Sequence, residues 1–302
     1  MAGMKSSGKS GSRGPGFYYG LYILSMLLFG TNGVIVSQIS IQSSQIVLFR
    51  TLIGGLLLTA LVFLRGGFDM ACIRSEFRFL SGGGIALGLN WVALFAAFRL
   101  LNISLATLIY YAGPMLVILL SPVLFQERLS RMKLASVFIV AVGLILISGS
   151  IAANRLNMTG LLVAAASAVF YASLIVFNKH IRLTGGLETA AVELDIAFLV
   201  VLVYSLLTSG IPHPQAGDLP WLLLLGVVNT GLAYLLYFSG LQKLPAQSVA
   251  LISYIDPVST LAFSALLLHE NLTAVQALGA VLIIGGAVLG ELKAKSGSQH
   301  SA

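Results

Sequence analysis

The chain contains an internal repeat. Residues 88–130 align with residues 231–273 at a constant offset of 143 and without a gap, so that Tyr111 corresponds to Tyr254. Each copy holds an odd number of hydrophobic segments, so the second copy would cross a membrane in the opposite direction to the first. Inverted repeats of this kind are typical of secondary transporters, in which the substrate binds between the two halves.

The composition indicates a membrane protein. Hydrophobic residues make up 58% of the chain and charged residues 9%, whereas soluble domains contain about 45–50% and about 25%. A membrane-spanning helix needs about 20 predominantly apolar residues. Ten segments meet this requirement, at residues 17–37, 43–64, 79–98, 103–125, 132–149, 158–178, 189–208, 219–241, 246–268 and 274–290.

We therefore predict an all-α polytopic membrane protein with ten transmembrane helices. The helices form two inverted five-helix repeats, at residues 17–149 and 158–290. The remaining ends, residues 1–16 and 293–302, are rich in Gly, Ser and Lys. Such segments bury too little apolar surface to fold, so we predict two disordered tails.

The basic residues predict the orientation. If the N-terminus is cytoplasmic, only Arg99 and Arg155 of the 17 Lys and Arg residues fall outside, and Arg50 lies within a span. Cytoplasmic loops carry the excess of Lys and Arg in membrane proteins. The pattern predicts a multi-pass protein of the cell membrane with both termini in the cytoplasm. The net charge of +7 is then a topological signal that contacts membrane lipid, and it implies no nucleic-acid partner.

Two motifs resemble a known family. The fourth span contains Tyr111–Pro114 (YAGP) and is followed by Glu127–Ser130 (ERLS), and the ninth contains Tyr254–Pro257 (YIDP) and is followed by Glu270–Thr273 (ENLT). These stretches resemble the EamA-type family of the drug/metabolite transporter superfamily. In that family each five-helix copy has a Pro in its fourth helix and ends that helix with Glu-x-Leu-Ser/Thr. The resemblance covers about residues 18–290.

The resemblance implies transport without specifying the cargo. Members of the family are thought to move amino acids, other metabolites, cations or nucleotide sugars. The second copy in the family more often has Glu before the Pro of its fourth helix, whereas this chain has Asp256 there. The shorter carboxylate still suits a proton or an amine, but it reaches less far.

Asp256 is the acidic residue with the best position for function. It lies midway along the ninth span, directly before Pro257. Proline leaves a carbonyl of the preceding turn without its helical partner, so Pro114 and Pro257 are predicted helix breaks. A carboxylate beside free carbonyls favours a proton or cation site. The alternative is a neutralised acid that only packs the kink.

Three other charged residues fall within spans. Glu193 and Asp195 are two residues apart and therefore face different sides of a helix. We expect Glu193 to face the bundle, and Asp195 to face Lys179 or Arg182 or to extend to the membrane surface. Arg50 has two open roles: a tie between helices, or a two-pronged hydrogen bond to a substrate carboxylate.

Neutral polar and aromatic residues complete the predicted cavity. Aromatic rings hold apolar groups or attract cations to their faces, and amides and hydroxyls fix orientation. The candidates for substrate binding are Asn32, Asn90, Trp91, Tyr110, Tyr111, Tyr171, Asn229, Tyr234, Tyr237, Ser253 and Tyr254.

The leading hypothesis is a secondary-active exporter of small molecules that works by alternating access and is coupled to protons through Asp256. A neutral or zwitterionic metabolite such as an amino acid is the first choice of cargo, followed by organic cations and then phosphorylated sugars, because paired Lys and Arg residues for a phosphate are missing. A membrane ligand sensor without transport is an open alternative. The sequence shows no catalytic constellation, metal site or cofactor motif. The protein is expected to be a monomer or a homodimer.

Overall fold

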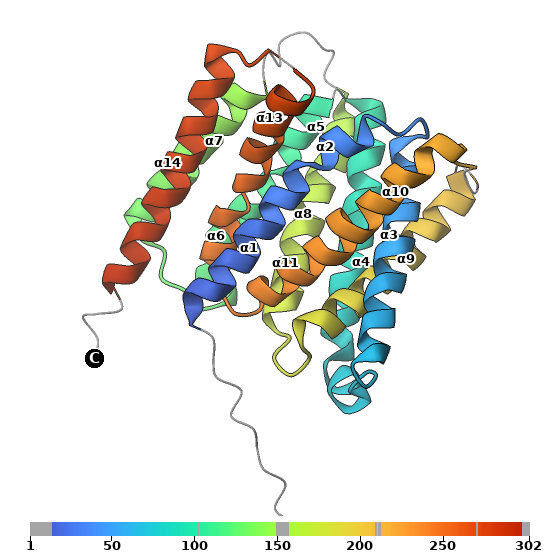
Figure 1. Ribbon diagram of the computed structural model, residues 1–302. Helices are drawn as coiled ribbons and strands as arrows, with labels where there is room; N and C mark the ends of the chain where they lie inside the picture. The colour runs from blue at the N-terminus through green and yellow to red at the C-terminus, as the bar shows by residue number, and fades with distance from the viewer. Residues whose placement is uncertain are drawn as a thin grey trace, which may run out of the picture.

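The computed structural model describes residues 14–101, 103–148, 157–208, 210, 213–269 and 271–297, and this part of the chain is helical without strands (Figure 1). The all-α prediction is confirmed. The helices are α1 (Pro15–Gly30), α2 (Asn32–Val36), α3 (Ser43–Leu64), α4 (Met70–Leu100), α5 (Ile103–Tyr110), α6 (Ala112–Leu124), α7 (Arg131–Ile147), α8 (Met158–Lys179), α9 (Gly186–Thr208), α10 (Leu219–Gly226), α11 (Ala233–Leu241), α12 (Ala246–Ile252), α13 (Ile255–Leu267) and α14 (Ala274–Gly297).

Nine helical segments of the described chain are long and apolar enough to cross a membrane. They correspond to nine of the ten predicted spans. The remaining predicted span, 132–149, is α7, which has 17 residues and lies beside α14 at one edge of the bundle (Figure 1). At about 1.5 Å per residue α7 is about 26 Å long, slightly less than a bilayer core of about 30 Å.

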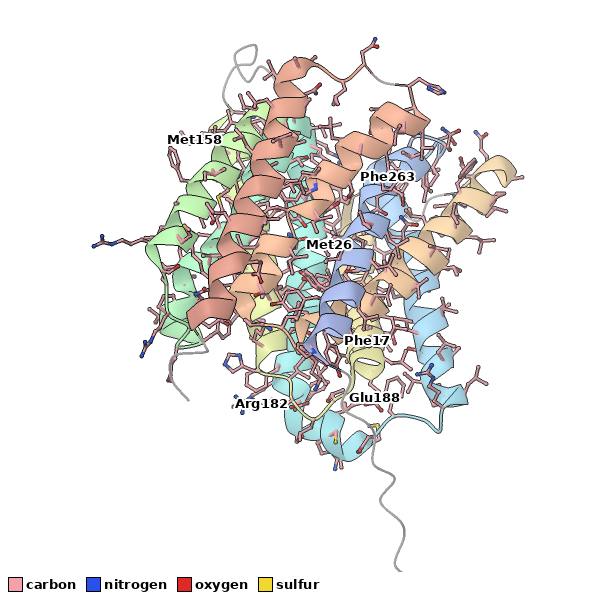
Figure 2. The ribbon with its side chains drawn as sticks, turned by 60° about the vertical axis from the view of Figure 1, so that its left-hand side comes forward. Phe17, Met26, Met158, Arg182, Glu188 and Phe263 are labelled. Atoms are coloured by element: carbon pink, nitrogen blue, oxygen red, sulfur yellow. The ribbon has the colours of Figure 1, made fainter. Side chains whose placement is uncertain are left out.

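The outer surface of the bundle is apolar. Large hydrophobic side chains are strongly exposed, for example Leu64 at 83%, Val123 at 81% and Leu207 at 80%. The charged residues Arg182 and Glu188 instead lie at one end of the bundle, and Met158 marks the opposite end (Figure 2). An apolar belt with charged ends is what a helical bundle needs in a lipid bilayer.

The third predicted span is longer than expected. The sequence predicted a loop at residues 65–78, but α4 begins at Met70 and continues for 31 residues, about 46 Å. Asp69 caps this helix by accepting hydrogen bonds from the backbone N–H groups of Cys72 and Ala71, each 3.1 Å long. The bonds from the backbone and thiol of Cys72, and then that from Ala71, hold the pKa of Asp69 below its usual range. The additional turns contain charged residues such as Arg74, Glu76 and Arg78, so hydropathy alone placed the start of the span too late.

The two predicted proline breaks are present, three residues before each proline. Pro114 has no N–H for the carbonyl of Tyr110, where α5 ends, and Pro257 has none for the carbonyl of Ser253, just after the end of α12. The first span is also divided, which the sequence did not predict. There the hydroxyl of Thr31 donates to the carbonyl of Leu28, 2.8 Å away, between α1 and α2.

Glycines let α4 approach α9 closely. A Cβ atom on Gly84 would lie 2.7 Å from Cβ of Ile196, and one on Gly88 would lie 2.7 Å from Cβ of Val200. Gly84 and Gly88 are four residues apart, so they lie on one face of α4. The absent side chains therefore bring the backbones of these two helices into contact.

The same packing occurs between α3 and the eighth span. A Cβ on Gly226 would lie 2.5 Å from Cβ of Ile53, and one on Gly231 would lie 2.7 Å from Cδ2 of Leu57. Ile53 and Leu57 precede the corresponding α9 residues by 143 positions, but these two glycines are five residues apart instead of four. The additional residue is accommodated by a π-helical segment, Val227–Leu232, between α10 and α11.

A second equivalent pair of contacts joins α7 to α14. A Cβ on Gly279 would lie 2.7 Å from the carbonyl oxygen of Gly143, and one on Gly286 would lie 3.2 Å from that of Ser136. Gly143 and Ser136 precede Gly286 and Gly279 by 143 positions. Each contact is therefore the image of the other when the two copies are exchanged, and the two helices run antiparallel.

The ends of the chain were predicted as tails. Residues 1–13 and 298–302 lie outside the described residues, as do residues 149–156 between α7 and α8. The helix α14 continues to Gly297, into the segment predicted as the second tail.

Candidate functional site

Asp256 lies where the two sequence copies meet. It belongs to the first turn of α13, just after the break that follows α12. Its Oδ2 atom accepts a hydrogen bond of 3.2 Å from the hydroxyl of Tyr111, which lies in the other break, between α5 and α6. Thr260 lies at 3.5 Å from Oδ1. The carboxylate is only partly exposed, so it depends on these few donors for solvation.

The two breaks also contact each other directly. Tyr254 is fully buried, and its hydroxyl donates a hydrogen bond of 3.0 Å to the carbonyl oxygen of Tyr111. Tyr110 packs edge-on against Tyr111, with ring centroids 5.1 Å apart. The helix breaks therefore turn polar backbone and aromatic side chains toward the centre of the bundle.

A group of hydroxyls surrounds Ser253. The hydroxyl of Tyr22 lies 2.9 Å from Oγ of Ser253, and Tyr171 donates to the same oxygen at 3.2 Å. Ser253 itself donates to the carbonyl of Val249 at 2.8 Å. The hydroxyl of Tyr237 is buried beside those of Tyr22 and Tyr171, but no hydrogen bond of normal geometry joins it to a partner in the described part of the chain. A buried hydroxyl without a well-formed hydrogen bond is costly, so it is a candidate to bind a polar ligand.

Aromatic rings line the same region. Tyr110 and Tyr171 are stacked at 5.1 Å, and Tyr234 packs against Tyr237 at 5.7 Å. Trp91 of α4 meets Tyr234 edge-on, at 5.7 Å between centroids. These rings come from α4, α5, α8 and α11, so the predicted aromatic residues are brought together.

Arg50 of α3 lies at the edge of this aromatic group. Its guanidinium is 5.4 Å from the centroid of the Trp91 ring. Nε donates to Oγ1 of Thr230 at 2.9 Å, and Nη2 lies 3.4 Å from the carbonyl oxygen of Asn229. Both partners belong to the π-helical segment, so Arg50 does tie two helices together. The sequence did not point to Thr230.

The side chains of the three predicted asparagines differ in their hydrogen-bond partners. Asn90 donates to the carbonyl of Ser167 at 2.8 Å and so joins α4 to α8. Asn229 donates to the carbonyl of Leu28, 2.7 Å away, at the end of α1. Asn32 has a buried Oδ1 without a hydrogen-bond partner among the described residues. The amides of Asn90 and Asn229 thus satisfy backbone carbonyls, while that of Asn32 has free acceptor capacity.

Glu193 faces the bundle, as predicted. It is fully buried, and both carboxylate oxygens accept from the side-chain amide of Asn178 at 2.8 and 3.0 Å. A Cβ on Gly83 would lie 2.2 Å from its Oε1, so this glycine leaves the space that the carboxyl fills.

Asp195 faces a different helix from Glu193, but not the partners that we expected. It accepts a hydrogen bond of 2.7 Å from the hydroxyl of Thr59 in α3. The ammonium of Lys179 instead donates to the carbonyls of Leu241 and Leu244 at the end of α11. Capping these carbonyls satisfies the lysine, which explains why it does not turn toward Asp195.

Three carboxylates outside the central region fasten one element to another, and sequence reasoning missed these contacts. Glu76 of α4 accepts from the backbone N–H groups of Arg182, Leu183 and Thr184 at 2.7, 3.0 and 2.8 Å. These N–H groups belong to the connection between α8 and α9. Charge-assisted bonds to backbone donors are stronger than neutral ones, so this contact holds the connection firmly.

Glu127 and Asp218 make similar contacts. Glu127, the first residue of the ERLS motif, accepts from the N–H groups of Ala246 and Gln247 at 2.7 and 3.0 Å, at the start of α12. Asp218 accepts from the N–H and the hydroxyl of Ser40 at 2.9 and 2.8 Å. The sequence indicated Glu127 only as part of the ERLS motif and did not predict its contact with α12. Its counterpart Glu270 lies outside the described residues.

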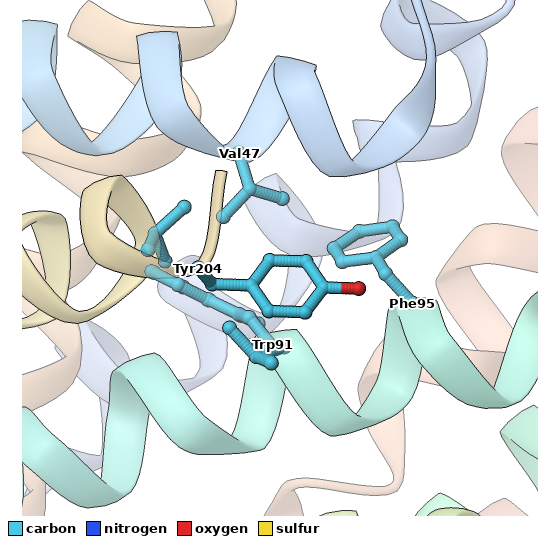
Figure 3. Close-up of a pocket in the computed structure, with 6 residues that line it drawn as sticks. Val47, Trp91, Phe95 and Tyr204 are labelled. Carbon is cyan, nitrogen blue, oxygen red and sulfur yellow. The ribbon is translucent and has the colours of Figure 1, made fainter. Parts of the chain in front are cut away.

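A small apolar pocket opens between α3, α4 and α9 (Figure 3). The hydroxyl of Tyr204 points toward the ring of Phe95 in this view. Neither residue was among the predicted site residues. Trp91 belongs both to this pocket and to the central aromatic group. The lining residues are Val47, Trp91, Val92, Phe95, Val201 and Tyr204.

The described residues contain no group of three or more His, Cys, Asp or Glu side chains that could hold a metal ion. The arrangement offers a carboxylate, several hydroxyls, aromatic faces and a guanidinium. Such groups can bind a small polar or zwitterionic molecule and can exchange a proton at Asp256.

Comparison with known proteins gives a consistent result. The model of the EamA-like transporter family matches residues 16–149 and again residues 158–290. An uncharacterised transporter of Bacillus subtilis is 26% identical over 274 residues, which cover 88% of this chain and 87% of the relative. The "Probable amino-acid metabolite efflux pump" of Salmonella typhimurium is 30% identical over 233 residues, which cover 72% and 78%.

A solved crystal structure shares the fold. It superposes with a TM-score of 0.82 at 22% sequence identity, and the match covers 92% of this chain and 99% of that one. At this identity the likeness concerns the arrangement of the helices only.

Proposed function

The chain belongs to the EamA-like transporter family, and from this membership we propose that it exports amino acids or related neutral or zwitterionic metabolites in exchange for protons. It is a multi-pass membrane transporter of small molecules. The observation that carries the proposal is the contact between Asp256 and Tyr111. It places an acid between the helix breaks of the two sequence copies, at 3.2 Å from a residue of the other copy.

The proposed architecture has ten spans in two inverted halves. The antiparallel packing of α7 on α14 supports counting α7 as a span. The repeated contacts of Gly143 with Gly279 and of Ser136 with Gly286 support the inversion. We place both termini in the cytoplasm of the cell because the basic residues then lie inside. Rocking of one half against the other would expose the central site alternately to the two sides.

Asp256 is the proposed coupling group. A carboxylate within a membrane protein is costly unless it has a partner or a function. Asp256 has two neutral donors, the hydroxyls of Tyr111 and Thr260. Binding of a proton and binding of a substrate ammonium group would compete for this one carboxylate. Competition of that kind is the physical basis of exchange, because the protein then changes the side to which it is open with either a proton or a substrate bound at Asp256.

The nature of the central group supports the proposed cargo. Hydroxyls of Tyr22, Tyr171, Tyr237 and Ser253 gather beside aromatic rings, which suits a small molecule with polar and apolar parts. The relatives named as amino-acid metabolite efflux pumps, 30% identical to this chain, point to the same class. A phosphorylated sugar is a weaker candidate, because Arg50 is the one basic side chain that we find at the aromatic group in the described structure.

An organic cation is the second candidate for cargo. The stacked rings of Tyr110 and Tyr171 and the nearby carboxylate of Asp256 offer the two features that attract a cation. An amino acid also carries an ammonium group, so both classes would use these residues. The two classes of cargo differ because an amino acid also has a carboxylate, which needs a positively charged partner in the protein.

Counterflow in liposomes tests the function. Purified protein is reconstituted into liposomes that contain one unlabelled amino acid at high concentration, and entry of the labelled form is followed for each of the twenty amino acids. A transporter exchanges label for its substrates and for no others, whereas a ligand sensor exchanges nothing. Liposomes without protein give the background. Exchange of quaternary ammonium compounds but of no amino acid would instead support the organic-cation candidate.

A further inference from the structure

We propose that Arg50 binds a carboxylate of the transported molecule, so that a free carboxylate is required of the substrate. This inference rests on the proposed transport function and names the chemical class of its cargo. It is carried by the surroundings of the guanidinium in the described structure.

The guanidinium of Arg50 is buried and has neutral partners only. Arg50 is 8% exposed. Of its five N–H donors, one donates to Oγ1 of Thr230 and one to the carbonyl of Asn229. In the described part of the chain no carboxylate forms an ion pair with it, and three donors have no hydrogen-bond partner. A buried charge without a counter-ion is costly, and an anionic ligand supplies one.

The orientation of the guanidinium is fixed by the π-helical segment. The hydroxyl of Thr230 donates its proton to the carbonyl of Leu225, 2.9 Å away and five residues earlier. Its lone pairs are therefore available to accept from Nε of Arg50 at 2.9 Å. With Nε held in this way, the Nη atoms form the free end of the guanidinium, and that end matches the two oxygens of a carboxylate.

The π-helical support of Arg50 lies in the second copy and has no equivalent among the described residues of the first. The π-helical segment Val227–Leu232 accommodates one more residue than the corresponding stretch of α4. That residue gives Thr230 its bond to the fifth residue before it, and a regular α-helix offers the fourth. The chain thus departs from its own repeat at the point where Arg50 is held.

The Trp91 ring completes the setting. Its centroid lies 5.4 Å from the guanidinium and 5.7 Å from the ring of Tyr234. Asp256 reaches the same aromatic group from the other side, through the hydroxyl of Tyr111 and the ring of Tyr110, and no ion pair joins it to Arg50 among the described residues. A carboxylate and a guanidinium at one aromatic group fit the opposite charges of a zwitterion, with its ammonium toward Asp256 and its carboxylate toward Arg50.

Competition between matched analogues tests the inference. The labelled amino acid that gives the largest counterflow is challenged with the same unlabelled amino acid, with its carboxamide, and with the amine that lacks the carboxyl group. A charge-assisted hydrogen bond contributes about 1.5–3 kcal/mol, so we expect the amino acid to compete about tenfold or more better than its carboxamide in the unmodified protein.

The variants Arg50→Gln and Thr230→Val distinguish the role of Arg50, which binds the carboxylate, from that of Thr230, which positions Arg50. Arg50→Gln should reduce the preference for the acid over the amide to less than twofold, and Arg50→Lys should retain part of it. Thr230→Val keeps the shape of the side chain but removes the acceptor for Nε, so the preference should fall while counterflow remains. Arg74→Gln, which removes an exposed arginine near the start of α4, is the matched control and should change nothing.

The outcomes distinguish this inference from the transport function. Equal competition by the amino acid and its carboxamide in the unmodified protein would overturn the role of Arg50 and leave amino-acid transport intact. An unchanged preference in folded Thr230→Val and Arg50→Gln proteins would do the same. Counterflow of no amino acid would refute the proposed function, and the inference with it. Thermal unfolding of each variant shows whether it is folded.

Discussion

The hydroxyl of Tyr254 donates a hydrogen bond of 3.0 Å to the carbonyl oxygen of Tyr111, the residue to which Tyr254 corresponds in the internal repeat. Two equivalent positions of the sequence thus meet at the centre of the bundle. Each lies in a helix break that precedes a proline. The breaks release polar backbone groups into the same region, and one of these groups is the carbonyl that Tyr254 satisfies.

Tyr254→Phe tests this central hydrogen bond. The substitution removes one hydroxyl and leaves the buried carbonyl of Tyr111 without that donor. We expect a loss of about 1 kcal/mol in the free energy of unfolding, since that is the usual contribution of such a bond. Chemical unfolding of the detergent-solubilised protein measures it. Tyr18→Phe is the control, because Tyr18 makes a ring contact with Phe17 but has no hydrogen bond from its hydroxyl in the described structure. Equal effects of the two substitutions would contradict the role of the bond.

Two glycines of α14 should respond in opposite ways to alanine. A Cβ on Gly279 would lie 2.7 Å from the carbonyl oxygen of Gly143, whereas one on Gly285 would meet nothing within 4 Å. Gly279→Ala should destabilise the protein by about 1–3 kcal/mol through overpacking. Gly285→Ala should be neutral or stabilise by up to about 1 kcal/mol, because alanine favours a helix. Thermal unfolding of both variants checks the contrast, and stability retained by Gly279→Ala would show that α7 and α14 are not packed this closely.

Glu127→Gln should loosen the start of α12. The carboxylate accepts from the N–H groups of Ala246 and Gln247, and an amide in its place offers one acceptor and one repelling donor. The loss of a charge-assisted bond costs about 1.5–3 kcal/mol. Hydrogen exchange of these two amides should therefore accelerate by about tenfold or more.

The contact of Glu76 with the N–H groups of Leu183 and Thr184 is an internal control for that measurement. It is made by a carboxylate of the same kind on other elements, so its exchange rates should stay unchanged in Glu127→Gln. Acceleration at both contacts would indicate general loosening of the fold. No acceleration at Ala246 and Gln247 would show that Glu127 does not protect them.

Several features of the centre could be predicted from the sequence because they depend on local chemistry. A proline removes the hydrogen bond to the carbonyl four residues before it, so Pro114 and Pro257 located both breaks, although α6 continues through Pro122 near its end. The offset of 143 then paired Tyr111 with Tyr254, and these two residues do contact each other. The aromatic residues were grouped correctly, because large rings in the middle of spans that also contain polar residues pack toward one another. These residues are Trp91, Tyr110, Tyr171, Tyr234 and Tyr237.

Other features depend on contacts that no local pattern encodes. The amides of Asn90 and Asn229, which the sequence predicts at the substrate site, donate to the carbonyls of Ser167 and Leu28, because buried amide donors must be satisfied by the nearest acceptor. The π-helical segment follows from a one-residue difference in glycine spacing, four in α4 and five in the eighth span. That difference gains meaning only once the packing partners Ile53 and Ile196 are known.

The length of α4 was wrong for a related reason. Charged residues such as Glu76 suggested a loop, since charges are excluded from the membrane core. The helix nevertheless begins at Met70, because Asp69 caps it and because the carboxylate of Glu76 binds the α8–α9 connection. Both are tertiary or capping interactions that hydropathy alone does not report.

The most direct test of proton-coupled transport is uptake into liposomes under an imposed pH gradient, with the Asp256→Asn variant beside the unmodified protein. An acidic lumen should drive accumulation of the labelled amino acid by the unmodified protein, because protons leave as the substrate enters. Asp256→Asn removes the group for which the proton and the substrate ammonium compete, so the variant should ignore the gradient, and any counterflow that it retains should be weaker than that of the unmodified protein. Gradient-driven accumulation that persists in Asp256→Asn would contradict the account.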